Sequence, residues 1–125
     1  AHNRLANRAT VVMVLLETEL GFRNVEAIAA VPGVDIIGSG SNDFTAELGA
    51  LGNYRHEKVL SAYSAAIAAC RKHGKPFVVG GIGDAGYVKA MIKDGAAPFL
   101  YSAIDSELMR DALQEKVNAA LAAVR

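Results

Sequence analysis

Two segments decide the fold of this chain: Val11-Val-Met-Val-Leu-Leu-Glu17-Thr18 and Val34-Asp-Ile-Ile-Gly-Ser-Gly-Ser-Asn42-Asp43. Each is a short apolar run followed by a carboxylate, as expected of a strand that is buried on both faces in a parallel sheet. A buried carboxylate without a partner costs more free energy than its packing returns, so Glu17 and Asp43 need a cation or hydrogen-bond donors. We therefore expect the two strand ends to share one metal site.

Apolar, strand-like runs alternate with helix-like segments along the chain. The four expected strands are Ala9 to Leu16, Val34 to Gly38, Pro76 to Gly80 and Pro98 to Ala103. Alternation of this kind is typical of parallel βα units. The sequence therefore predicts an α/β domain over residues 1–125, made of four βα units with no linker and no internal repeat.

Residues that begin or end helices punctuate the chain between these runs. Asn24, Asp84 and Asp105 are of the types that cap helix N-termini, and glycine is typical of helix ends. The expected helices cover residues 25–31, about 57–73, 85–94 and 105–124. The apolar face of the second of these helices consists of Val59, Leu60, Tyr63, Ile67 and Cys70.

Four βα units fit two architectures. One is a small open doubly wound sheet, and the other is half of a (β/α)₈ TIM barrel, whose usual length of ~250 residues is about twice that of this chain. In both, the carboxyl ends of the strands form the functional edge. Glu17, Asp43, the turn from Gly80 to Asp84 and the segment from Ser102 to Asp105 should therefore gather there.

Two carboxylates on neighbouring strands are suitable ligands for a divalent cation. Adjacent parallel strands lie ~4.8 Å apart, so both side chains can reach one ion. Mg²⁺ or Mn²⁺ is commonly held by one or two protein carboxylates, with water and substrate completing the octahedron. The alternative is that Glu17 pairs with Arg23 and that Asp43 caps a turn.

The loop from Gly38 to Asp43 is rich in glycine and small polar residues. Such residues allow backbone N–H groups to turn toward an anion, so the loop is a candidate site for a small carboxylate, with a plain βα turn as the alternative. The second glycine turn, from Gly80 to Asp84, matches no phosphate-binding pattern. His2, His56 and His73 have no partner at metal-ligand spacing.

Composition narrows the classes of function. Thirteen basic and thirteen acidic residues are interspersed, and the formal net charge is zero, so no nucleic-acid partner is expected. No apolar run reaches the ~18 residues needed to cross a bilayer, and no signal peptide opens the chain, so no membrane association is expected. The single cysteine, Cys70, excludes an internal disulfide and is expected in the core of a cytoplasmic protein.

Several motifs occur together and in order over nearly the whole chain. They are Leu16-Glu17-Thr18, Gly21-Phe-Arg-Asn-Val-Glu-Ala-Ile-Ala-Ala-Val-Pro-Gly-Val-Asp35, Gly40-Ser-Asn-Asp43-Phe, Leu48-Gly49, Gly52-Asn-Tyr-Arg-His56, Ala68-Ala-Cys-Arg-Lys-His-Gly-Lys75 and Gly80-Gly81. In this combination the chain resembles the HpcH/HpaI aldolase and citrate lyase family. It is most similar to the class II pyruvate aldolases, which include 4-hydroxy-2-oxoheptanedioate aldolase and the hydroxyketoacid aldolases.

The resemblance implies a metal-dependent aldolase on a TIM barrel. Glu17 and Asp43 match the family's two carboxylate ligands, for Mg²⁺ or Mn²⁺ and with Co²⁺ or Zn²⁺ also possible. The metal would bind pyruvate or a related 2-oxo acid and stabilise its enolate as a Lewis acid, and the enolate would add to an aldehyde. By the same match, the loop of Gly40, Ser41, Asn42 and Asp43 would bind the substrate, with backbone N–H groups of Asn42 and Asp43 on its carboxylate.

The resemblance also implies that this chain is the C-terminal half of the barrel. Residues Ala1 to Arg8 resemble the family's connection into its fifth strand. No catalytic residue is therefore expected in this chain, because the family's base and catalytic arginine lie in the N-terminal half, which would be a required partner. Ser41, Phe44, Glu57 and Leu15 depart from common family residues and bear on substrate preference.

Two alternatives to the aldolase remain open at this point. One is a non-catalytic half-barrel or flavodoxin-like module that binds a small ligand or a partner. Another is an acyl-CoA lyase of the same superfamily. Family members are commonly oligomers, so we also expect a homo-oligomer, with the C-terminal helix from Asp105 to Arg125 packing on a neighbour.

Overall fold

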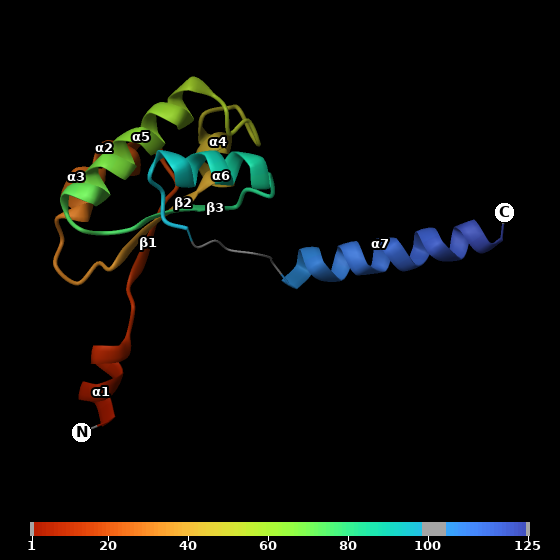
Figure 1. Ribbon diagram of the computed structural model, residues 1–125, viewed down its shortest axis with the longest axis horizontal. Helices are drawn as coiled ribbons and strands as arrows, with labels where there is room; N and C mark the ends of the chain where they lie inside the picture. The colour runs from red at the N-terminus through yellow and green to blue at the C-terminus, as the bar shows by residue number, and fades with distance from the viewer. Residues whose placement is uncertain (1, 99–104, 125) are drawn as a thin grey trace.

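The computed structural model describes residues 2–98 and 105–124, and it contains three strands and seven helices in those ranges (Figure 1). The elements in chain order are α1 His2–Ala9, β1 Met13–Leu16, α2 Glu19–Arg23, α3 Val25–Ala29, β2 Ile36–Gly40, α4 Ser41–Glu47, α5 Glu57–Lys72, β3 Phe77–Gly80, α6 Ala85–Asp94 and α7 Asp105–Ala123.

The three strands form one parallel sheet in the order β1-β2-β3. The prediction of parallel βα units is therefore confirmed for this part of the chain. The fourth expected strand, Pro98 to Ala103, lies outside the described residues except for Pro98, so the number of four units stays a prediction.

The two faces of the sheet differ in burial, as the aligned residues of the three strands show. Leu16, Ser39 and Val79 are aligned across the three strands, and all three are buried. The neighbouring row, one residue earlier on each strand, points to the opposite face because side chains alternate along a strand. This row contains Leu15, which is 49% exposed, Gly38, and Val78, which is buried, so the opposite face is exposed at β1 but not at β3.

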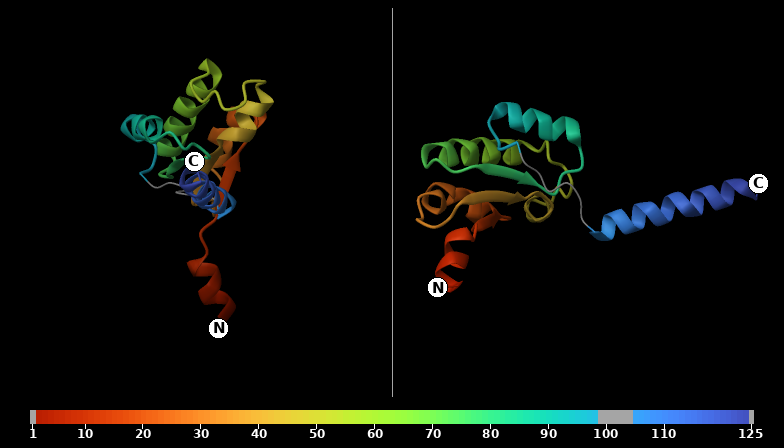
Figure 2. Two further views of the ribbon diagram at one scale, coloured as in Figure 1. Left: turned by 90° about the vertical axis from the view of Figure 1, so that its right-hand side faces the viewer. Right: turned by 60° about the horizontal axis from the view of Figure 1, so that its bottom comes forward.

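The helices from α2 to α6 lie on one side of the sheet, as Figures 1 and 2 show. They cover a core of aromatic side chains in which the ring centroids of Phe22 and Phe44 are 4.3 Å apart. Tyr63 packs against both Phe22 and Phe77 at 5.6 Å. The core therefore joins α2, α4 and α5 to the strand β3.

The first two strands differ from their expected bounds. The run from Ala9 to Leu16 was expected to be extended throughout, but α1 ends at Ala9 and β1 begins only at Met13. The second strand extends two residues further than expected, to Gly40, and α4 begins at the next residue, so the loop expected from Gly38 to Asp43 is not present: its residues belong to β2 and to the first turn of α4. β1 is only partly buried, in contrast to the expectation of burial on both faces.

The helix predictions are mostly correct. The helix expected at 25–31 is shorter, ends at Ala29 and is preceded by α2, which the sequence did not indicate. Asn24 stands at its N-cap, but its side chain donates to the carbonyl of Leu20 at 3.0 Å instead of capping. In α5 the expected buried face is confirmed except for Leu60, which is 41% exposed.

The two C-terminal helices differ in their packing. Asp84 caps α6 by accepting a hydrogen bond from the Tyr87 N–H at 3.0 Å, and Gly95 ends the helix at a φ of 114°, both as predicted. α7 has no buried residue and extends away from the sheet and its helices (Figures 1 and 2). None of the helices among residues 2–98 and 105–124 is long and apolar enough to span a membrane.

Candidate active site

A cavity of about 590 Å³ opens at the carboxyl ends of the three strands. Its lining residues are Leu15, Glu17, Ser39, Gly40, Ser41, Asn42, Asp43, Tyr54, Gly80, Gly81, Ile82, Gly83 and Glu107. The structure thus brings both predicted carboxylates, the end of β2 with the first turn of α4, and most of the turn after β3 to one place. In the segment from Ser102 to Asp105, only Asp105 is described, and it does not line the cavity.

Glu17 follows β1, and its side chain lies directly over Gly40 at the end of β2. A Cβ atom built on Gly40 would lie 2.5 Å from Glu17 Cγ and 2.7 Å from Oε1. Glycine is therefore required at position 40 for the Glu17 side chain to take this place. The carboxylate is exposed and forms no ion pair or hydrogen bond with any described residue.

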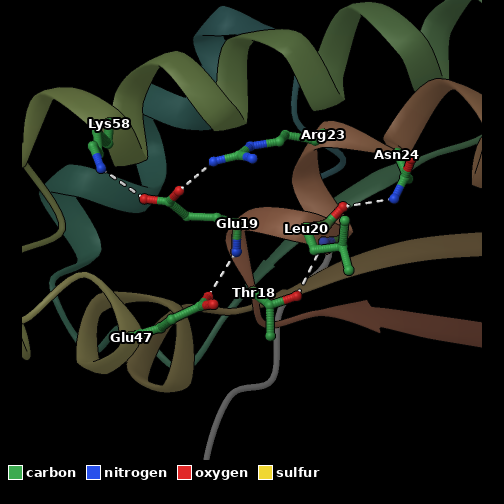
Figure 3. A network of polar contacts seen from close by, with 8 residues as sticks. Thr18, Glu19, Leu20, Arg23, Asn24, Glu47 and Lys58 are labelled. Carbon is green, nitrogen blue, oxygen red and sulfur yellow. Dashed lines mark hydrogen bonds and ion pairs between the residues drawn. The ribbon is translucent and has the colours of Figure 1, made fainter.

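The alternative partner for Glu17 is engaged elsewhere. Arg23 forms an ion pair with Glu19 at 2.7 Å, and Lys58 binds the other oxygen of that carboxylate at 2.7 Å, as Figure 3 shows. Hydrogen bonding by Lys58, with a further contribution from Arg23, lowers the pKa of Glu19. The interpretation that Arg23 neutralises Glu17 is therefore wrong.

Asp43 lies in the first turn of α4, whose N-cap is Gly40 rather than an acidic residue. Its carboxylate is exposed and has no hydrogen-bond or ion-pair partner in the described part of the chain. The alternative that Asp43 caps a turn is therefore also wrong. Both carboxylates are exposed to solvent, so the argument from burial that first singled them out does not apply to this chain.

The donor set of the cavity fits a hard cation. No group of three or more His, Cys, Asp or Glu residues suitable for a metal occurs within residues 2–98 and 105–124. Three carboxylates line the cavity, those of Glu17, Asp43 and Glu107, and the first two follow neighbouring strands. One or two carboxylates match the oxygen ligands of Mg²⁺ or Mn²⁺, which keep several water or substrate ligands. Zinc sites use three or four nitrogen, sulfur or carboxylate ligands, so Zn²⁺ fits these residues less well.

Ser41 lines the cavity, but its side chain is fully buried. Its Oγ donates to the Gly80 carbonyl and accepts a hydrogen bond from the Tyr63 hydroxyl at 2.6 Å. Ser39 Oγ lies 3.1 Å from Ser41 Oγ and accepts from the Gly80 N–H at 3.2 Å. These bonds connect the first turn of α4 to β3 and α5, so Ser41 stabilises the cavity wall through its buried hydroxyl.

Tyr54 is a cavity residue that the sequence did not single out. It comes from the loop between α4 and α5, where a solvated side chain is the default expectation. Its hydroxyl donates to Asn42 Oδ1 at 2.6 Å and lies 3.3 Å from the Gly81 carbonyl oxygen. No local pattern indicated this role, because it depends on the chain folding back over the ends of β2 and β3.

Cys70 is buried in the core, as predicted, and does not line the cavity. Burial raises the pKa of the thiol to about 11. The thiolate is the nucleophilic form of cysteine, so Cys70 is a packing residue at neutral pH.

The chain matches the model of a known protein family. The family model described as HpcH/HpaI aldolase/citrate lyase matches residues 1–112. Among curated proteins, the 5-keto-4-deoxy-D-glucarate aldolase of Klebsiella pneumoniae subsp. pneumoniae is 44% identical over 71 residues, which are 57% of this chain and 28% of that protein. The protein of the same name from Salmonella newport is 42% identical over 71 residues, again 57% of this chain and 28% of that protein.

Solved structures resemble this chain over most of its length. An HpcH/HpaI aldolase/citrate lyase family protein from Burkholderia cenocepacia J2315 has a TM-score of 0.76 and 32% identity, over 94% of this chain and 45% of its own. Citrate synthase SbnG has a TM-score of 0.77 over 98% of this chain and 49% of its own, and at 22% identity it shows the fold alone. The chain thus spans about half the length of these proteins.

Proposed function

This chain belongs to the HpcH/HpaI aldolase/citrate lyase family, and we propose that it supplies the metal- and oxo-acid-binding half of a class II aldolase. The reaction proposed is the formation or cleavage of a 4-hydroxy-2-oxo acid, from pyruvate or a related 2-oxo acid and an aldehyde. The observation that carries the proposal is the pair of Glu17 and Asp43, which line one cavity and have no partner among the described residues.

The proposed metal ligands are the carboxylates of Glu17 and Asp43, for Mg²⁺ or Mn²⁺. When bound, the ion supplies a Lewis acid that stabilises the negative charge developing on the keto oxygen of the substrate. Gly40 gives Glu17 the space to face the cavity. The α4 backbone N–H groups of Asn42 and Asp43 have no intrahelical acceptor and are available to the substrate carboxylate.

The names of the curated relatives support this class of substrate. Numbered from its other end, a 5-keto-4-deoxy-D-glucarate is a 2-oxo acid with a methylene at carbon 3 and a hydroxyl at carbon 4. Aldol cleavage between carbons 3 and 4 of such a compound gives pyruvate or a pyruvate-like fragment and an aldehyde. The two relatives match this chain at 44% and 42% identity over 71 residues.

The remaining chemistry is proposed to come from an N-terminal half of the barrel. Deprotonating the 2-oxo acid requires a general base, and the resemblance to the family assigns this base to the N-terminal half. The base and a catalytic arginine are therefore expected from that half, which would also cover the exposed face of the sheet at Leu15. We further propose that the complete protein is a cytoplasmic homo-oligomer.

The test is proton exchange of pyruvate in D₂O, followed by NMR of the methyl group. A protein completed by an N-terminal half is expected to exchange these protons in the presence of Mg²⁺ or Mn²⁺ and to lose exchange when EDTA is added. Background exchange under both conditions would exclude the aldolase and would favour a non-catalytic binding module.

Variants of the two carboxylates locate the metal site. Glu17→Gln and Asp43→Asn keep the size of each side chain but remove its charge, so each is expected to abolish metal-dependent exchange. Asp94→Asn is the control, because Asp94 is an exposed residue at the far end of α6 and does not line the cavity. Wild-type exchange in either carboxylate variant would remove that residue from the proposed site.

A further inference from the structure

The side chain of Asn42 is held in one orientation by Tyr54. The Tyr54 hydroxyl donates to Asn42 Oδ1 at 2.6 Å, and Gly81 leaves room beside the amide, since a Cβ atom there would lie 3.4 Å from Asn42 Nδ2. Gly81 has a φ of 74°, a conformation that favours glycine. Oxygen and nitrogen of the amide are therefore in distinct surroundings.

Tyr54 is itself fixed from the side away from the cavity. Its backbone carbonyl accepts a hydrogen bond from the Tyr87 hydroxyl at 2.9 Å, and the two rings lie 6.3 Å apart between centroids. The next residue, Arg55, pairs with Asp84 at 3.3 Å and lies over the Tyr87 ring. The loop that carries Tyr54 is thus attached to the start of α6, which makes its phenol a defined part of the cavity wall.

This arrangement leaves two hydrogen-bond donors free in the cavity. Because Asn42 Oδ1 accepts from Tyr54, the amide presents its Nδ2 hydrogens, which have no acceptor among the described residues. An amide N–H₂ group is neutral and binds hydroxyl, carbonyl or carboxylate oxygens. It gives no advantage to an alkyl chain.

We propose that Tyr54 is a specificity-determining residue that orients the Asn42 amide, so that the amide donates to an oxygen on the chain of the aldehyde substrate. The site then prefers aldehydes with hydroxyl or carboxylate groups over alkyl aldehydes of similar size. This inference rests on the proposed aldolase function and adds to it a substrate class and a residue, Tyr54, to which the resemblance assigned no role.

The test compares two aldehydes in the complete, metal-loaded protein, with pyruvate as the common partner. Tyr54→Phe removes only the hydroxyl, so kcat/KM for glyceraldehyde is expected to fall about three- to tenfold, the effect of losing one neutral hydrogen bond. For propanal, which offers no oxygen beyond its carbonyl, the change is expected to stay within about twofold. A loss of active protein would lower both values equally.

Tyr87→Phe is the matched control. Like Tyr54→Phe, it removes one tyrosine hydroxyl. The hydroxyl lost is the one that donates to the Tyr54 backbone carbonyl, so the hydrogen bond between Tyr54 and Asn42 is kept. The ratio of kcat/KM for the two aldehydes is expected to stay at the wild-type value. If Tyr87→Phe lowers the ratio as much as Tyr54→Phe, the hydroxyl of Tyr54 merely anchors the loop and the inference is overturned.

A double-mutant cycle tests whether Tyr54 acts through Asn42. Asn42→Ala is expected to lower the ratio of the two kcat/KM values as Tyr54→Phe does, and adding Tyr54→Phe to it should have no further effect on the ratio. Additive effects would overturn the inference. Pyruvate proton exchange, measured without aldehyde, separates this failure from failure of the aldolase proposal, because only the latter abolishes exchange in the unaltered protein.

Discussion

At the scale of single residues, the site depends on a glycine as much as on its carboxylates. Gly40 lies beneath Glu17, and any side chain there would occupy the volume that Glu17 Cγ and Oε1 now fill. The φ of Gly40 is −87°, which every residue adopts easily, so its role is space and not backbone freedom. Position 40 is therefore a direct test of the site that leaves the fold intact.

Gly40→Ala is expected to weaken metal binding with little change in stability. The new methyl group would displace the Glu17 carboxylate from its present place, while the helix-facing core is untouched. Mn²⁺ affinity of the complete protein, measured by isothermal titration calorimetry, should fall at least about tenfold, as expected when one ligand is lost from its place. The midpoint of urea unfolding should stay close to the wild-type value.

Gly83→Ala is the control for this substitution. Gly83 lines the same cavity, but a Cβ atom there would have no neighbour within 4 Å. The Mn²⁺ affinity of the Gly83→Ala variant should match that of the unaltered protein. Equal affinities for Gly40→Ala and the unaltered protein would show that Glu17 is not a metal ligand from its present position.

At the scale of elements, α6 links the cavity wall to the rest of the domain. Asp84 caps the helix, and its Oδ2 atom also lies 3.3 Å from an Arg55 nitrogen next to Tyr54. The Tyr87 backbone N–H, with a further contribution from Arg55, lowers the pKa of the Asp84 carboxyl. The start of α6 thus fixes both the helix and the loop that carries Tyr54.

Asp84→Ala is expected to lower the urea midpoint at neutral pH, because the Tyr87 N–H loses its acceptor. Since the folded pKa of Asp84 is below its usual value of 3.8, its contribution to stability is full above that pH and declines as the pH falls through the folded pKa. Urea unfolding at pH 7 and at about pH 2.5 should therefore show the difference from wild type shrinking in acid.

Arg55→Ala distinguishes the two contributions of Asp84 to stability, because it removes the ion pair with Arg55 and keeps the N-cap of α6. Arg55 and Asp84 are both exposed, and exposed pairs contribute little to stability. Arg55→Ala should therefore lower the urea midpoint less than Asp84→Ala does. A larger loss for Arg55→Ala would show that the loop contact, and not the helix cap, is the main contribution of Asp84.

At the scale of the whole molecule, two apolar surfaces lack a partner in the described part of the chain. β1 pairs only with β2 there, and Val11, Val12 and Leu15 beside its free edge are exposed. On α7 the exposed large apolar side chains are Leu108, Met109, Leu113, Val117, Leu121 and Val124. Surfaces of this kind mark interaction sites or cause aggregation.

The isolated 125-residue chain is therefore expected to self-associate. Analytical ultracentrifugation should show sedimenting species larger than the 13.1 kDa monomer. Co-expression with the N-terminal half of a family barrel should replace these species by complexes that contain both halves in equal amounts, because the strand edge is then paired. A stable, soluble monomer of the isolated chain would contradict the proposal that a second half-barrel is required.

The sequence by itself determined the parallel βα pattern, the approximate bounds of α3, α5, α6 and α7, the core position of Cys70 and the candidate carboxylates. These features depend on local patterns: apolar runs, capping residues and a charge after a strand. The shared motifs pointed to the family that the match over residues 1–112 shows. The ligand roles of Glu17 and Asp43 stay a prediction.

Only the tertiary structure decided which groups meet at the cavity. It assigned Arg23 to Glu19, placed Glu17 over Gly40 and turned the Ser41 hydroxyl into the interior. It also brought Tyr54 to Asn42, 12 residues apart in sequence, through a loop with no pattern of its own. The physical reason is that these contacts depend on the register of the strands and on the paths of the loops between helices and strands. The local propensities of residues determine neither.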